Sequence, residues 1–148
     1  MRWVLAGFML LMAAASGNAG PAEEAFSVIE QFKKAYDAAD PPAILQLFAS
    51  DSVFLGTTMQ KPTRDRDAIL KYFQASASAN QPKRVEIENY EVLQLSGTAV
   101  LFTGQDTFFQ TREGKSVPTA ARFTFLITKG TQGWSIAHFH SSRRPEAQ

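Results

Sequence analysis

The chain ends in the stretch Trp134-Ser-Ile-Ala-His-Phe-His-Ser-Ser-Arg-Arg-Pro145, which has the pattern of a final β-strand. Side chains of a strand alternate between its two faces. Regular alternation predicts that one face consists of Trp134, Ile136, His138, His140 and Ser142. This face begins apolar and ends polar, and it holds both histidines of the sequence. Such a profile is typical of a strand that starts in a core and runs into the mouth of a pocket.

Three further β-rich runs precede this strand, at about residues 84–95, 99–111 and 119–128. Short segments that contain glycine separate the four runs, as β-hairpins require. The second half of the chain therefore predicts a four-stranded antiparallel meander.

Helical periodicity is confined to the first half of the chain, at residues 21–39, 42–48 and 63–77. A short strand is expected at residues 51–55. Asp40 suits the cap of the second helix, with Pro41 at its first position. Because helices come first and strands follow, we expect an α+β fold with three N-terminal helices packed on a curved, mainly antiparallel sheet.

Composition excludes several classes of function. The formal net charge is +1, and Arg2 is the only charged residue before Glu23, so loss of a leader brings it to zero. A neutral chain has no overall attraction for nucleic acid or an anionic membrane. The sequence has no cysteine and no phosphate-binding or dinucleotide motif, so we expect no cofactor.

Residues 1–19 have the pattern of a signal peptide. A positive charge at Arg2 precedes an apolar run over residues 3–15, and Gly17-Asn18-Ala19 offers small residues for cleavage. The run is shorter than the roughly 20 apolar residues of a membrane span. We therefore expect one domain at residues 20–148, periplasmic or secreted and free of the membrane once the leader is removed.

The order of these elements resembles the nuclear-transport-factor-2-like superfamily, whose members are cone-shaped α+β domains that include SnoaL-like and ketosteroid-isomerase-like proteins. The segments 121–126 and 133–145, with 67–73 and 97–104 upstream, look similar to the association domain of calcium/calmodulin-dependent protein kinase II and its stand-alone bacterial relatives. Relatives often carry a glycine before the third helix, where this chain has Arg64-Asp65-Arg66. The superfamily includes isomerases, cyclases, dehydratases, binding proteins and oligomerisation domains.

The resemblance implies a cavity between helices and sheet, with Arg122 pointing into it. A guanidinium at a pocket floor suits a carboxylate. With His138, His140 and Ser142 on the neighbouring strand, it predicts a polar wall for a small ligand. The aromatic residues Phe54, Tyr72 and Phe108 are further candidates for the lining, although core packing is the alternative for each.

Asp106 and His140 are the candidate catalytic residues. A carboxylate among apolar neighbours can have a raised pKa and act as a base. Related isomerases are implied to use an acidic residue in this way, with a tyrosine as oxyanion donor, and Tyr36, Tyr72 and Tyr90 are the tyrosines available. The alternative is a cross-strand ion pair between Asp106 and Arg122. A metal shared by the two histidines would need Asp106 or Glu91 as a third ligand, and we expect none.

The sequence favours an exported module that binds a small molecule such as a carboxylate and forms a homodimer or larger assembly. Phe123, Phe125 and Ile127 are the expected outer face for self-association, since an exposed apolar face needs a partner. The alternative is a cofactor-independent acid/base enzyme of the ketosteroid-isomerase or polyketide-cyclase type. Neither alternative involves nucleic acid.

Overall fold

The computed structural model describes residues 19–77 and 83–146, apart from the side chain of Arg112. The expected leader, save for Ala19, lies outside the described residues. Within the described part of the chain, no helix is long and apolar enough to cross a membrane.

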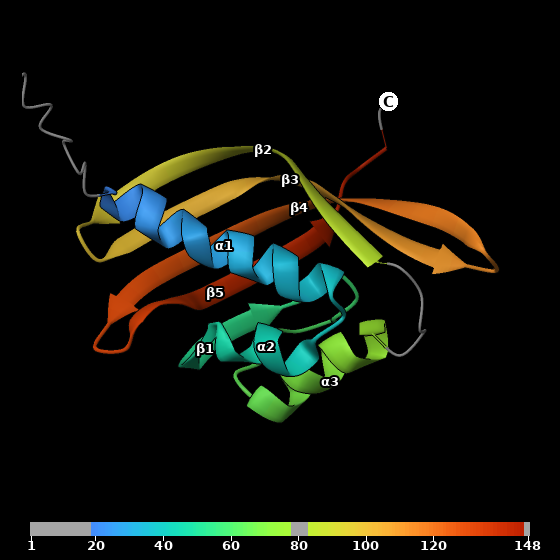
Figure 1. Ribbon diagram of the computed structural model, residues 1–148, viewed down its shortest axis with the longest axis horizontal. Helices are drawn as coiled ribbons and strands as arrows, with labels where there is room; N and C mark the ends of the chain where they lie inside the picture. Colours follow the sequence, from blue (N-terminus) through green and yellow to red (C-terminus); the bar gives the residue numbers. More distant parts are fainter. Residues whose placement is uncertain (1–18, 78–82, 147–148) are drawn as a thin grey trace, which may run out of the picture.

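Three helices and five strands follow one another in the expected order (Figure 1). They are α1 (Pro21–Asp37), α2 (Pro41–Gln46), β1 (Phe48–Leu55), α3 (Arg66–Ala77), β2 (Lys83–Ser96), β3 (Ala99–Arg112), β4 (Lys115–Gly130) and β5 (Gly133–Arg143). The β3–β4 hairpin is longer than predicted, because pairing continues to its tip, where Arg112 lies opposite Lys115.

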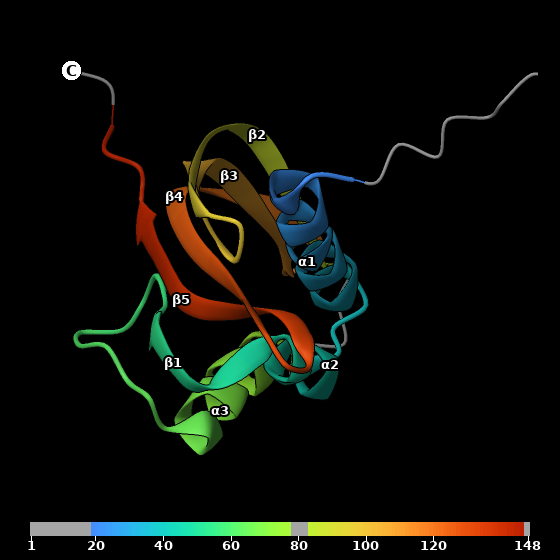
Figure 2. The same ribbon diagram turned by 90° about the vertical axis from the view of Figure 1, so that its left-hand side faces the viewer.

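The five strands form one sheet in the order β1-β5-β4-β3-β2. The last four strands form the predicted antiparallel meander, and β1 adds to its edge in parallel with β5. Figures 1 and 2 show α1 along the inner face of the curved sheet and α2 and α3 beside β1. The expected α+β fold is therefore confirmed.

Local signals set the helix ends. The side chain of Asp40 accepts a hydrogen bond from the Ala43 backbone at 3.0 Å, and Pro41 opens α2, as the sequence predicts. Arg66 begins α3 and donates to the carbonyls of Leu45, Phe48 and Ala49 at 3.1–3.2 Å. Arg64 donates to the Asp51 carbonyl. The arginines found where relatives often have glycine thus fasten the start of α3 to the α2–β1 segment.

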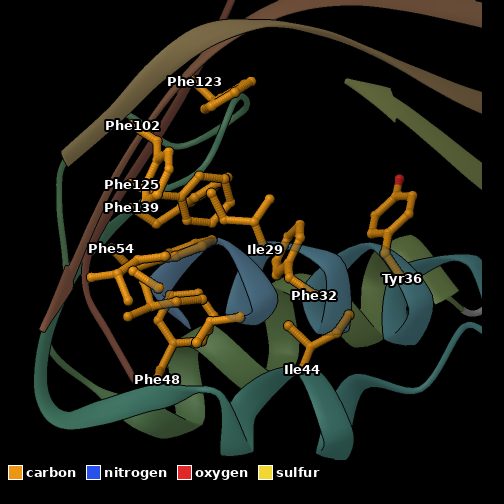
Figure 3. Close-up of a cluster of buried hydrophobic side chains, with 14 of the residues drawn as sticks. Ile29, Phe32, Tyr36, Ile44, Phe48, Phe54, Phe102, Phe123, Phe125 and Phe139 are labelled. Carbon is orange, nitrogen blue, oxygen red and sulfur yellow. The ribbon is translucent and has the colours of Figure 1, made fainter. Parts of the chain in front are cut away.

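The core is a cluster of aromatic and aliphatic side chains between α1, α3 and the inner face of the sheet (Figure 3). Phe32 of α1 packs against Phe125 and Phe139, with ring centroids 5.4 and 5.6 Å apart. Phe123, Phe125 and Ile127 are buried in this cluster. The prediction that they form an outer face is wrong. The apolar side of β4 packs against the helices, and its opposite side, which carries Arg122, faces solvent.

An extra residue in β5 reverses the predicted alternation. Leu126 lies opposite His138, but the next residue of β4, Ile127, lies opposite Ile136, so the ladder passes over Ala137. A bulge of this kind shifts every later side chain by one position. Trp134 and Ile136 pack inward as expected, but beyond the bulge the inward residues are Phe139, Ser141 and Arg143.

Candidate functional site

A cavity of about 290 Å³ lies between α1, α3 and the inner face of the sheet. This volume is at the lower end of the range for small-molecule sites, roughly 300–1,000 Å³. Fourteen residues line the cavity: Phe32, Tyr36, Thr57, Thr58, Tyr72, Phe73, Ala75, Ser76, Phe108, Gln110, Thr119, Phe139, Ser141 and Arg143.

Aromatic rings form most of the apolar wall. Tyr36 of α1 meets Phe108 of β3 edge to face at 5.2 Å between centroids. Tyr72 of α3 packs on Phe54 at 5.0 Å, and Gly56 leaves room for its ring, since a Cβ there would lie 2.4 Å from Tyr72 Cζ. The wall suits a flat or chain-like apolar body.

Polar groups interrupt this wall on the side of β5. The hydroxyls of Thr57 and Ser141 are 2.6 Å apart and tie the loop after β1 to the strand. Ser141 is 3 % exposed, whereas Arg143, two residues on, is exposed and lines the cavity where β5 ends. Since no acidic side chain is paired with Arg143 among the described ion pairs, its guanidinium is available to an anion.

Only two of the predicted ligand-binding residues, Tyr72 and Phe108, line this cavity. Phe54 is fully buried in the core behind Tyr72. Arg122 is exposed on the outer face of the sheet, where its Nε donates to Ser142 Oγ at 3.4 Å. The expectation that Arg122 and Ser142 enter the cavity is wrong, because their pair lies on the face opposite Phe123.

His138 and His140 also lie on the outer face, opposite Leu126 and Thr124. The expectation that they line the cavity is wrong, because the bulge at Ala137 turns them to the outer face. Burial, and then the charge of His140, lowers the pKa of His138 below its ordinary value. Within residues 19–77 and 83–146, no group of three or more His, Asp or Glu side chains is placed to hold a metal ion.

Asp106 faces inward, but it is not among the lining residues of the cavity. It is 4 % exposed, and its Oδ1 has no hydrogen-bond partner among the described residues. Burial raises the pKa of Asp106 to about 7, and the nearby Arg144 opposes this rise. The carboxyl is therefore half protonated near neutral pH, the property of an effective proton acceptor.

The expected ion pair between Asp106 and Arg122 does not form. Asp106 lies opposite Ala121, and Arg122 lies opposite Gln105 on the other face. The nearer arginine is Arg144, which donates to the Asp106 carbonyl at 3.1 Å and pairs with Glu88 at 2.8 Å. Strand register thus keeps Asp106 and Arg122 on opposite faces of the sheet.

Sequence reasoning missed most of the polar lining, and Arg143 in particular. Arg143 and Arg144 had the pattern of a solvated tail after the last strand. No local signal marks the bulge that turns Ser141 and Arg143 inward. Gln110 and Thr119 lie in predicted strands, but the sequence does not show that their side chains enter the cavity.

The three helices, the curved sheet and the cavity between them define a domain of the nuclear-transport-factor-2-like class. The model of the SnoaL-like domain family matches residues 26–145, and the chain belongs to this family. No match to the chain was found among curated proteins.

Solved structures agree with this assignment. A Xanthomonas campestris protein, provisionally assigned as a calcium/calmodulin-dependent protein kinase II association domain, is 27% identical over 93% of this chain and all of its own, with a TM-score of 0.77. A ketosteroid isomerase-like protein from Erwinia carotovora atroseptica is 20% identical over 84% of this chain and 97% of its own, with a TM-score of 0.69.

A protein of the same fold from Streptomyces avermitilis, provisionally assigned as a dehydratase, is 12% identical over 85% of this chain and 97% of its own, with a TM-score of 0.74. At such identities the last two structures establish the fold alone. The SnoaL-like fold commonly binds small ligands or carries isomerase and dehydratase activities.

Proposed function

We propose that this chain binds a small, partly apolar carboxylate in the cavity between helices and sheet, with Arg143 as the anchor. The observation that carries the proposal is the placement of one guanidinium on an aromatic-walled cavity of about 290 Å³. The rings take up the apolar body, and Ser141 and Thr57 offer hydroxyls beside the charge. Arg143 takes the role that the sequence suggested for Arg122.

Titration calorimetry with aromatic carboxylates and their uncharged amides tests this proposal. Arg143→Gln should weaken binding of the carboxylate by about 10-fold or more, because a hydrogen bond to a charged group contributes roughly 1.5–3 kcal/mol. It should leave the amide nearly unaffected. Arg122→Gln is the matched control on the outer face and should bind like the wild type. Equal losses in both variants, or no binding of any carboxylate, would contradict the proposal.

A second candidate, an acid/base enzyme, is favoured by Asp106. Its buried carboxyl, with a pKa of about 7 and an unpaired oxygen, has the properties of a general base. Asp106 does not line the cavity itself but lies two residues from the lining residue Phe108 on the same face of β3, so the substrate would have to reach past that ring. His140 is no longer a candidate base for this cavity, because it lies on the outer face. Exchange of α-protons of cyclic ketones in deuterated water, abolished by Asp106→Asn, is the expected sign of this activity. Exchange at equal rates in both proteins would exclude Asp106 as the base.

We also propose that the chain is exported and acts in the periplasm or outside the cell. The charged, apolar and small-residue segments of residues 1–19 support this. N-terminal sequencing of protein from the periplasmic fraction should find a mature chain that begins at Gly20. Recovery of the intact chain from the cytoplasm would contradict it.

We also propose that the chain self-associates through the outer face of the sheet. Strand register places an apolar row across all five strands, interrupted only by a histidine: Leu93, Leu101, Leu126, His138 and Val53. Leu93 is 57 % exposed. This row replaces the predicted phenylalanine face. A second copy of the chain, packed on the same row, would remove it from water.

A further inference from the structure

Lys83, the first residue of β2, is a buried cation with no acidic partner. Its side chain belongs to a residue that is only 7 % exposed, and no described ion pair includes it. It lines a small second cavity that shares Tyr36 and Ser76 with the main cavity. A buried ammonium without a counter-ion is costly, and burial lowers the pKa of Lys83.

Three hydrogen-bonding groups converge on a single oxygen beside this lysine. Lys83 Nζ, Gln110 Nε2 and Tyr36 Oη each lie 3.5 Å from Ser76 Oγ. The ammonium and the amide nitrogen can only donate, and a serine hydroxyl can accept at most two hydrogen bonds. All three contacts are at the long limit of hydrogen bonding. Ser76 can accept from Lys83 and Gln110 while it donates to Tyr36, so the three contacts are satisfied, but only at long distances. A bound oxyanion would offer Lys83, Gln110 and Tyr36 shorter hydrogen bonds and would give the buried ammonium a counter-ion.

This cluster and Arg143 reach the ligand from different places on the sheet. Gln110 pairs with Val117 of β4, and Arg143 pairs with Ala121. The two positions are four residues apart along β4, which is roughly 13 Å at about 3.3 Å per residue. Figure 3 shows the Tyr36 hydroxyl directed away from the phenylalanine cluster. A molecule in the aromatic-walled space would thus meet Arg143 at one end and the lining residues Tyr36, Ser76 and Gln110 at the other, with the Lys83 ammonium 3.5 Å from Ser76 Oγ.

We propose that Lys83, Ser76, Gln110 and Tyr36 form a second oxyanion subsite, so that the cavity selects small dicarboxylates with an apolar middle. This rests on the proposed function, which requires only one carboxylate, at Arg143. Arg143 binds one carboxylate where β5 ends, and the cluster around Lys83 binds the other. The buried cation then has an anionic partner in the complex.

Comparison of azelate with nonanoate, which has the same chain and a single carboxylate, tests the subsite by calorimetry. Azelate should bind to the wild type at least 10-fold more tightly. Lys83→Met, which removes the charge and keeps an apolar stem, should reduce this preference below threefold and leave nonanoate binding unchanged. Equal binding of the two acids by the wild type, or an unchanged preference in the variant, overturns the subsite while leaving the proposed function intact. Failure to bind either acid also overturns the subsite, and the proposed function falls as well only if the aromatic carboxylates fail to bind.

A measurement on the wild type covers the case in which the variant does not fold. Acetic anhydride labels lysines at a rate set by their exposure and free amine, and peptide mass spectrometry reports each site. Azelate should slow acetylation of Lys83 at least fivefold, and nonanoate should not. Lys71, exposed on α3, is the internal control and should be labelled equally with either acid. Equal labelling of Lys83 with and without azelate contradicts the proposal.

Discussion

At the scale of single residues, Gly56 decides the shape of the cavity. It follows β1, and its missing side chain leaves the space that the Tyr72 ring occupies. A methyl group there would lie 2.5 Å or less from two ring carbons, far inside van der Waals contact. Tyr72 is also held by Phe54 and Phe73, so the ring has little freedom to retreat.

Gly56→Ala should therefore displace Tyr72, cost about 1–3 kcal/mol of unfolding free energy and weaken ligand binding. Urea denaturation and a ligand titration measure the two effects. Gly97→Ala is the matched control, because a Cβ there meets nothing within 4 Å. Wild-type affinity and stability in the Gly56 variant would show that the ring is free to move.

Burial of the Asp106 carboxyl makes the unfolding free energy of the protein depend on pH. Its folded-state pKa of about 7 lies above the ordinary value of 3.8, so between these values the folded chain holds a proton that the unfolded chain has lost. The stabilisation is complete below about pH 4 and is lost as the pH rises towards 7. The full effect is at most roughly 4 kcal/mol.

Asp106→Asn should remove this pH dependence. Between pH 4.5 and 7.5 the wild type should lose more unfolding free energy than the variant, because all other carboxyls are common to both. Urea denaturation at the two pH values gives the difference. Asp51→Asn, at an exposed position, should follow the wild type. Parallel pH profiles for Asp106→Asn and the wild type would mean that the carboxyl is not buried in solution.

At the scale of an element, the bulge in β5 sets the contents of the cavity. Beyond Ile136 the extra residue Ala137 brings Phe139, Ser141 and Arg143 to the inner face. Removal of Ala137 would leave Ile136 and Phe139 two positions apart, so the same side chains would face inward on a regular strand. Removal of His140 would instead turn Ser141 and Arg143 outward.

Deletion of Ala137 should therefore leave a folded protein that still binds the carboxylate, whereas deletion of His140 should abolish binding. Circular dichroism reports folding and calorimetry reports binding for both proteins. The two deletions are matched in length and lie in the same strand. Retained binding in the His140 deletion would show that the inner face beyond the bulge does not form the site.

At the scale of the whole molecule, the outer face of the sheet is the feature that a second copy would cover. Leu126→Asp places a charge in the middle of the apolar row and should convert an assembly into a monomer, as measured by light scattering at micromolar concentration. Gln46→Asp, at an exposed position of α2, should leave the mass unchanged. A monomeric wild type would remove self-association from the proposal.

The sequence by itself determined the order of helices and strands, because periodicity, capping residues and glycine turns are local properties. Asp40 and Pro41 mark α2, and the turns of the meander separate its strands. It also named Tyr72 and Phe108 as candidates for the cavity lining, and both line it. Phe108 lies on a strand with regular alternation, and Tyr72 lies on a helix with regular periodicity.

Only the tertiary structure decided which face of β4 and β5 is covered and which arginine reaches the cavity. Alternation divides a strand into two faces but does not say which one meets α1, and the bulge at Ala137 shifts the division within β5. Arg122 and the histidines therefore lie outside, and Arg143 lies inside. The parallel edge strand β1 and the cluster around Lys83 likewise depend on contacts between residues far apart in the chain.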